Sequence, residues 1–225
     1  MSFADKKLSE IAISIPGSTA LLREYDLDFC CGGADTLGAA VAEKNLNLAE
    51  IEARLTELQE SKQQDDEQRW LTAPYAEIID HIIHRYHERH RAQLQELIVL
   101  AERVESVHGD RDDCPVGVAA ELHNVYVDLS SHMMKEEQIL FPMIKMGNYA
   151  MARMPIQVME HEHAEHGEHL EVLKALTNNL TPPADACNTW RALYSGIKEF
   201  MDDLMMHIHT ENNILFPRVI EEGGR

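Results

Sequence analysis

HMMKEEQILFP, at residues 132–142, is followed 75 residues later by HIHTENNILFP, at residues 207–217. In each copy a histidine is followed four residues later by a glutamate, and the copy ends in Leu-Phe-Pro. Residues four apart lie on the same face of an α-helix, one turn from each other. His132 with Glu136, and His207 with Glu211, therefore each direct an imidazole and a carboxylate to one point. Two such helices facing each other have the side chains to hold metal.

The stretches that precede these copies repeat as well. Apolar residues and histidines recur in both at spacings of four, three, four and three: Ile83, His87, His90, Leu94 and Leu97, then Met159, His163, His166, Leu170 and Leu173. These are the inward positions of an amphipathic helix. The chain therefore predicts two copies of one helical hairpin, which a pseudo-twofold axis would bring together at the centre of a bundle.

Four long helices are predicted after Pro74, over about residues 74–108, 115–146, 154–178 and 184–222. The breaks between them fall at Gly109-Asp110, Gly147-Asn148 and Pro182-Pro183. No run alternates as a strand would. Because short connections join antiparallel neighbours, the predicted fold class is all-α, an up-and-down four-helix bundle with a small N-terminal helical domain.

Three segments follow from the pattern. Residues 1–58 are the small helical domain, and they contain Cys30-Cys31-Gly32-Gly33, in which the paired glycines indicate a turn. Residues 59–73 begin with a polar and charged stretch, QESKQQDDEQRW at residues 59–70, and we expect the segment to be a linker. Residues 74–225 are the bundle.

Composition limits the classes of function. A formal net charge of −19 makes nucleic-acid binding through phosphate contacts unfavourable. There is no run of about 18 apolar residues that would span a membrane, and the N-terminus lacks the apolar stretch of a secretion signal. We therefore expect a cytoplasmic protein. Its four cysteines have no CxxC spacing and should be thiols.

The inward histidines and glutamates predict a dinuclear metal site. In the first and third helices the apolar stripe alone does not separate His87 from His90, or His163 from His166. Four imidazoles and two bridging carboxylates suit a pair of iron or manganese ions in a bundle core. Donors without thiolate favour iron over a structural zinc. A lone core histidine is usually a packing residue, but two glutamates buried without a partner would be strongly unfavourable.

The remaining histidines are expected to be exposed or to lie around this site, among them His81, His84, His108, His123, His161, His169 and His209. Asp128 lies one turn before His132 and is a candidate for orienting its ring, as ligating imidazoles usually require.

At these residues the chain resembles the hemerythrin-like family. More narrowly, it resembles the di-iron proteins that repair iron–sulfur clusters, the repair-of-iron-centres family. The resemblance rests on the vicinal cysteines and on IIDHIIHRYHERHRAQL (78–94), SSHMMKEEQILFPMIK (130–145), VMEHEHAEH (158–166) and DDLMMHIHTENNILFPR (202–218). It implies two non-haem iron ions bridged by carboxylates, with the ligands His87, His132, Glu136, His163, His207 and Glu211.

Oxygen-carrying hemerythrins are less similar to this chain. They use a fifth histidine, with an HxxxH pair in one helix, whereas the residue four after His163 is Gly167, and His166 is one position short. Fewer imidazoles imply more open coordination. That suits iron release or ligand chemistry better than reversible oxygen carriage.

The resemblance implies a stress-response protein that restores iron–sulfur clusters damaged by nitric oxide or oxidants, through iron donation or nitric-oxide chemistry. Its partners would be damaged iron–sulfur proteins, with nitric oxide or oxygen as small ligands. Cys30 and Cys31 are either redox thiols or an incidental pair near a turn. Alternatives are a hemerythrin-like sensor or carrier of oxygen or nitric oxide, and a nitric oxide reductase, so enzyme activity is left open. The first domain docks on its own bundle or, in a homodimer, on a second chain.

Overall fold

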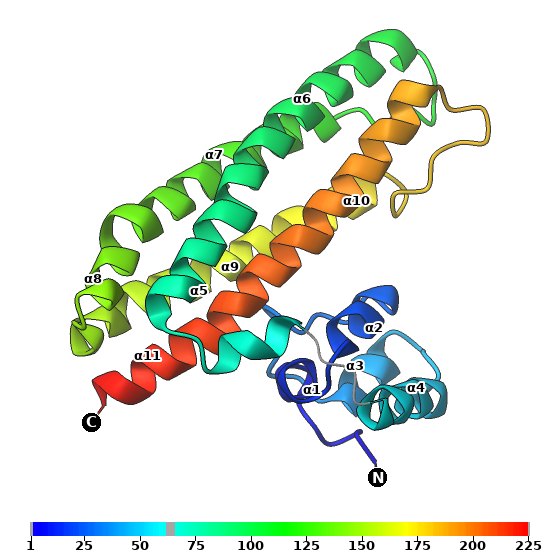
Figure 1. Ribbon diagram of the computed structural model, residues 1–225. Coiled ribbons are helices and arrows are strands. Elements are labelled where there is room, and N and C mark those ends of the chain that lie inside the picture. The colour runs from blue at the N-terminus through cyan, green and yellow to red at the C-terminus, as the bar shows by residue number, and fades with distance from the viewer. Residues whose placement is uncertain (1, 62–65, 225) are drawn as a thin grey trace.

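The computed structural model describes residues 2–61 and 66–224. Apart from an isolated bridge between Lys7 and Thr36, the described residues form helices, turns and loops. The predicted all-α bundle is therefore confirmed. Four long helical columns lie side by side and run alternately up and down, as Figure 1 shows for α6, α7, α9 and α10.

Each column corresponds to one of the four predicted helices. In chain order they consist of α5 (Tyr75–His81), η2 (Ile82–His87) and α6 (Glu88–His108); α7 (Val118–Lys135), η3 (Glu136–Leu140) and α8 (Phe141–Lys145); α9 (Tyr149–Leu176); and α10 (Asn188–His209), η4 (Thr210–Leu215) and α11 (Phe216–Gly223). α6 packs on α7 and α10, while α9 packs on α7 and α11. Apolar side chains from all four columns fill the core between them, among them Leu94, Leu122, Leu173 and Phe200.

The third column begins at Tyr149, earlier than the predicted start near residue 154, and Pro155 lies inside it. Packing accounts for the difference. A Cβ on Gly223 would lie 2.8 Å from the backbone of Tyr149, so the bare glycine lets the end of α11 approach the first turn of α9. This tertiary contact offsets part of the cost of a proline in a helix interior, which is about 3 kcal/mol.

Wide π-helical turns interrupt three of the columns in the described chain, at η2, η3 and η4. Those at η3 and η4 run directly into the Phe-Pro of each repeat, at Pro142 and Pro217. A proline lacks the backbone N–H and its ring clashes with the carbonyl four residues earlier. Widening the preceding turn relieves both problems, and such turns are frequent at functional sites.

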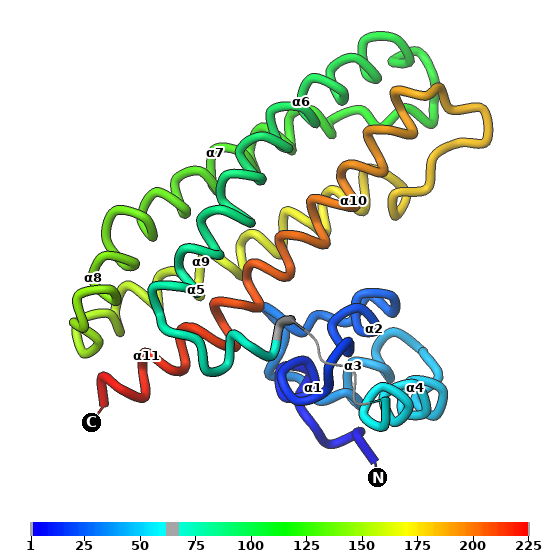
Figure 2. Tube along the Cα trace, in the orientation of Figure 1, coloured from blue at the N-terminus to red at the C-terminus, as the bar shows by residue number. Residues whose placement is uncertain are grey.

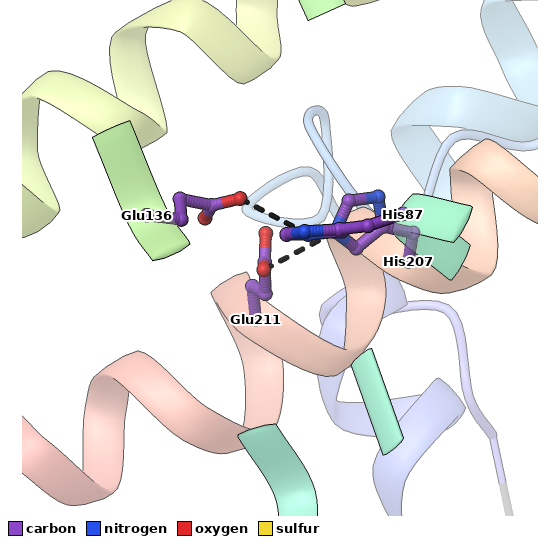
Figure 3. A group of neighbouring side chains, drawn as sticks. All are labelled: His87, Glu136, His207 and Glu211. Atoms are coloured by element: carbon purple, nitrogen blue, oxygen red, sulfur yellow. Dashed lines mark hydrogen bonds and ion pairs between the residues drawn. The ribbon is translucent and has the colours of Figure 1, made fainter. Parts of the chain in front are cut away.

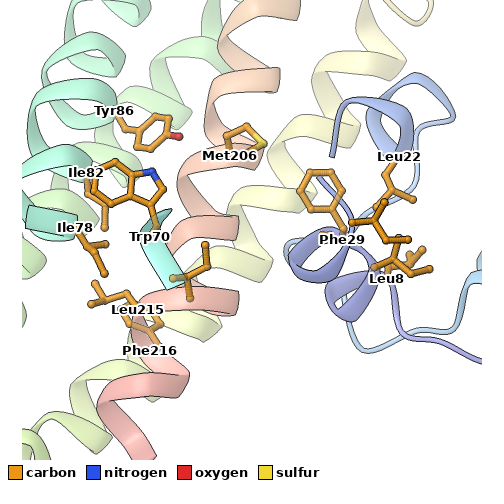
Figure 4. Packing of buried hydrophobic residues seen from close by; sticks show 14 of the residues in the cluster. Leu8, Leu22, Phe29, Trp70, Ile78, Ile82, Tyr86, Met206, Leu215 and Phe216 are labelled. Carbon is orange, nitrogen blue, oxygen red and sulfur yellow. The ribbon is translucent and has the colours of Figure 1, made fainter. Parts of the chain in front are cut away.

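The N-terminal unit consists of four short helices, α1 (Leu8–Ser14), α2 (Ser18–Glu24), α3 (Leu37–Glu43) and α4 (Leu48–Glu60). The tube in Figure 2 places this unit beside the part of α10 that leads into η4. Figure 4 shows Leu8, Leu22 and Phe29 inside the unit, with Met206 of α10 between them and Trp70. The apolar residues of the unit and of this end of the bundle form one continuous buried cluster.

The segment 59–73 makes its own contacts with the bundle. Residues 62–65 of this predicted linker lie outside the described residues, but η1 (Asp66–Leu71) carries Trp70, which is 7% exposed. Arg218 fastens the segment by donating to the carbonyl oxygens of Trp70 and Ala73. Within the described residues, no helix has the length and apolar character needed to cross a membrane.

Candidate metal centre

Six side chains from the four columns converge inside the bundle. They are the predicted ligands, and each is at most 1% exposed: His87, His132, Glu136, His163, His207 and Glu211. His87 ends η2, Glu136 begins η3 and Glu211 lies in η4, so the π-helical turns position three of the six. Figure 3 shows Glu136 and Glu211 turned toward the imidazoles of His87 and His207.

The donor atoms form two groups that share both glutamates. One consists of His87, His207, Glu136 and Glu211, and the other of His132, His163, Glu136 and Glu211; within each group the donors lie within 4.8 Å of one another. Each group offers two imidazoles and two carboxylates. One ion in each group would be joined to the other by both carboxylates, which is how bundle cores build dinuclear sites.

Outer hydrogen bonds decide which nitrogen of three imidazoles faces the centre. The Nδ1 atoms lie close to acceptors on neighbouring columns: His87 at 2.7 Å from Glu137, His132 at 3.0 Å from Glu162, and His163 at 2.8 Å from the side-chain oxygen of Asn212. Carboxylate and amide oxygens accept, so each Nδ1 carries a hydrogen and donates it. A neutral ring then presents the Nε2 lone pair to the centre, the arrangement found in metal-ligating histidines.

These donors fit a pair of cations. The Nε2 atoms of His132 and His163 lie 3.1 Å apart, and Nε2 of His163 lies 3.0 Å from Oε2 of Glu211. The carboxylate of Glu136 is buried as well, and its Oε2 lies 3.3 Å from Nε2 of His87 and 3.4 Å from Nε2 of His132. Lone pairs that face one another in a dry interior are stable only around positive charge, which metal ions or protons supply.

Protons take this role when no metal is bound. Burial lowers the pKa of His87, but hydrogen bonds with Glu136 and Glu137 outweigh it and raise the pKa to about 9. Burial likewise lowers the pKa of His163, and the hydrogen bond with Glu211 outweighs it and raises the pKa to about 9. Metal therefore competes with protons for these imidazoles.

The geometry separates the histidines that the sequence pattern left as alternatives. His87 and His163 direct Nε2 at the shared glutamates, at 3.3 Å from Glu136 and 3.0 Å from Glu211. His90 and His166 are buried beside the centre and belong to neither donor group. Their rings pack 5.3 Å from His207 and 5.0 Å from His132, respectively, centroid to centroid.

Asp128 does not orient His132, so this prediction was wrong. Its carboxylate lies 3.2 Å from Nε2 of His169, and Glu162 of α9 bonds to His132 instead. An inward imidazole turns its outer nitrogen toward the adjacent column, so a residue one turn away on the same helix does not reach it.

Sequence reasoning missed the three acceptors that hold the rings, although a signal for them exists. Each is the immediate sequence neighbour of a predicted ligand: Glu137 follows Glu136, Glu162 precedes His163, and Asn212 follows Glu211. Adjacent residues on a helix point about 100° apart. A polar residue next to an inward ligand therefore faces the neighbouring column.

The vicinal cysteines lie next to the backbone of His163. Cys30 and Cys31 are free thiols, with their sulfur atoms 3.8 Å apart. Sγ of Cys31 lies 3.1 Å from the backbone oxygen of His163, and Sγ of Cys30 lies 3.1 Å from Oδ1 of Asp28. Asp28 and the two thiols also form a group close enough to bind a metal ion.

Comparisons with known proteins agree with this architecture. Residues 78–219 match the family model of the hemerythrin HHE cation binding domain, and residues 4–59 match a domain of unknown function, DUF542. A protein of Haemophilus influenzae named "Probable iron-sulfur cluster repair protein" is 69% identical, over 99% of this chain and 100% of its own length.

Two further relatives carry the name "Iron-sulfur cluster repair protein YtfE". The protein of Musicola paradisiaca is 57% identical over 98% of both chains. That of Escherichia coli is 57% identical over 98% of this chain and 99% of its own. Because the bundle matches the cation-binding domain and the similarity extends over nearly the whole chain, the protein belongs to the hemerythrin-like iron–sulfur cluster repair family.

Proposed function

We propose that this protein restores damaged iron–sulfur clusters by means of two iron ions bridged by Glu136 and Glu211. The names of the relatives support the repair role, and the matched domain supports a cation site in the bundle. Nitrogen and oxygen donors without thiolate favour iron over structural zinc. The clients would be damaged iron–sulfur proteins in the cytoplasm, where the free thiols of this chain would stay reduced.

The sharing of both glutamates by the two donor groups carries this proposal. His87 and His207 would hold one ion, and His132 and His163 the other. When bound, the ions supply redox and ligand-exchange chemistry. The chain itself keeps the imidazoles in register through their outer hydrogen bonds, and it shields the donors from bulk water, since none is more than 1% exposed.

We assign the vicinal thiols a part in passing iron or nitric oxide between the centre and the surface. His163 links the two places, because its ring faces Glu211 and its backbone oxygen accepts a hydrogen bond from the Cys31 thiol. Cys31 is only partly buried, whereas the donors of the centre are closed off. The Cys31 thiol would therefore be placed to receive a ligand that leaves the centre beside His163.

Iron content and cluster repair by the purified full-length protein test the proposal. Protein from iron-replete cells should hold about two irons per chain and should reactivate a dehydratase whose iron–sulfur cluster was damaged by nitric oxide. The double variant Glu136→Gln, Glu211→Gln should lose both properties. Full repair by that variant would refute the proposal.

The matched control is the double variant Glu96→Gln, Glu160→Gln, which changes the net charge equally at exposed positions. It should keep both the iron and the repair activity. Protein loaded with an iron isotope then separates the two chemistries. Label found in the repaired client indicates iron donation, whereas repair without label indicates nitric-oxide chemistry.

A further inference from the structure

Two imidazoles of the centre, those of His87 and His163, have hydrogen-bond partners at equivalent positions in the two helical hairpins. His87 donates through Nδ1 to Glu137, and His163 donates through Nδ1 to Asn212. Each acceptor is the residue that directly follows a shared glutamate. These two rings are therefore supported in equivalent ways by the two halves of the chain.

The other two imidazoles break this relation. His132 donates to Glu162, which directly precedes His163. The equivalent position, directly before His87, is Tyr86, and its ring stacks on His207 with centroids 5.2 Å apart and an interplanar angle of 14°. Nδ1 of His207 is buried and has no hydrogen-bond partner among the described residues. At the sequence position equivalent to that of Glu162, the chain thus has a ring stacked on the face of the imidazole instead of an acceptor for its Nδ1.

This difference acts on metal binding through the position of one hydrogen. Without metal, Nε2 of His207 lies 3.2 Å from Oε1 of Glu211, to which it can donate, and 3.2 Å from Nε2 of His87. A metal ion needs the Nε2 lone pair, so the hydrogen must move to Nδ1. There it meets no described acceptor, and a buried N–H without a partner is unfavourable. His132 bears no such cost, because Glu162 receives its Nδ1 hydrogen.

We propose that the two ions are not equivalent, and that the iron held by His87 and His207 is the labile one that this protein gives up to its client. The iron held by His132 and His163 stays behind. This inference rests on the proposed function. Release of ferrous iron would be a ligand exchange without electron transfer, in which donors of the client or chelator replace the two imidazoles and the shared carboxylates, and His87 takes up the proton that it lost when the ion bound. The hydrogen of His207 returns to Nε2 and again faces Glu211.

The expected difference follows from the usual effect of such outer hydrogen bonds, whose loss weakens metal affinity about 10–100-fold. Anaerobic protein loaded with ferrous iron and mixed with a colorimetric chelator should release it in two phases of equal size, separated in rate by about that factor. Cobalt(II), which needs no control of oxidation state, should bind in two calorimetric steps.

Substitutions at Tyr86 and Glu162 show which ion gives rise to each release phase. Tyr86→Glu supplies the missing acceptor and should slow the fast phase at least about tenfold, whereas the control Tyr86→Phe keeps the stacked ring without an acceptor and should leave two phases. Glu162→Gln weakens the support of His132 and should accelerate the slow phase. Glu162 is partly exposed, so this second arm holds even if Tyr86→Glu fails to fold.

Single-phase release by the unsubstituted protein, or a fast phase that a folded Tyr86→Glu variant leaves unchanged, would overturn the inference. A fast phase that responds only to Glu162→Gln would do the same. These results are independent of the repair assay. Two release phases without cluster repair would support the difference between the two ions and refute the repair role. Cluster repair with a single release phase would support the repair role and refute the difference between the ions.

Discussion

The ring of Phe141 lies against the imidazole of His87, with centroids 5.8 Å apart and planes 22° from parallel. Phe216 lies against His163 in the same manner, at 6.0 Å and 7°. Each phenylalanine belongs to one Leu-Phe-Pro copy and supports the histidine of its own hairpin. The aromatic residue of the motif therefore fixes the ring planes around the centre.

Phe141→Ala should remove this support and leave a cavity. We expect the free energy of unfolding to fall by about 3–5 kcal/mol and the iron affinity to fall as well, while Phe141→Leu keeps most of both. Denaturant titration and competition with a chelator measure the two quantities. Leu122→Ala is the control, because Leu122 is buried but lies about 15 Å along the helix from His132. It should lower stability alone, and an equal loss of iron in both variants would contradict this role of Phe141.

Metal binding should release protons. Since the pKa values of His87 and His163 are about 9 without metal, both rings are protonated at pH 7 and must lose a proton to bind an ion. We expect about two protons released per chain at pH 7 and an affinity that falls as the pH decreases below 9. Calorimetry in buffers of different ionisation enthalpy measures the release.

The same shifts set the pH dependence of the metal-free chain. The folded pKa values are raised above the ordinary 6.5, so the stability they contribute is fully present below pH 6.5 and is lost as the pH rises toward 9. Denaturant titrations across this window should show the decline. It should shrink in Glu136→Gln, Glu211→Gln, because the carboxylates that raise both pKa values are gone. A flat profile in the unsubstituted metal-free chain would contradict the assignment.

The two adjacent thiols should differ in reactivity. The hydrogen bond with Cys31, then burial and the charge of Asp28, hold the pKa of Cys30 well above its ordinary value. Because the thiolate is the reactive form, iodoacetamide at pH 8 should label Cys31 well before Cys30, by about tenfold or more. Fragmentation mass spectrometry of the shared peptide distinguishes the two sites. Asp28→Asn should narrow the difference, and equal labelling of both cysteines would be evidence against it.

The proline of the second repeat should matter for the metal more than for the fold. Pro217→Ala restores a backbone N–H and lets the wide turn Thr210–Leu215 tighten, which moves Glu211. We expect iron affinity to fall by about tenfold with no loss of helix content by circular dichroism. Pro155→Ala is the control, since Pro155 lies inside α9, which has no π-helical turn. Loss of iron in both variants would indicate a general effect of proline removal.

The sequence predicted the four columns and the convergence of the six candidate donors, because both rest on repeated helical spacing. It did not choose between His87 and His90, which both lie on the apolar stripe, since the π-helical turn Ile82–His87 shifts the register that the spacing assumes. It also missed Glu137, Glu162 and Asn212, because their contacts cross between columns. The periodic spacing of apolar residues along one helix does not specify which residues of a neighbouring helix it contacts.

Because each donor group takes side chains from both helical hairpins, neither hairpin can form the centre by itself. Residues 75–145 carry two of the imidazoles and one of the shared carboxylates, and residues 149–223 carry the same set. Neither fragment completes a group alone, since each group takes one imidazole from either side. Two copies of one fragment, related by a true twofold axis, would carry the full inventory. Two fragments made separately would therefore associate through the donors of the centre. The short connection at residues 146–148 makes the two halves parts of one chain.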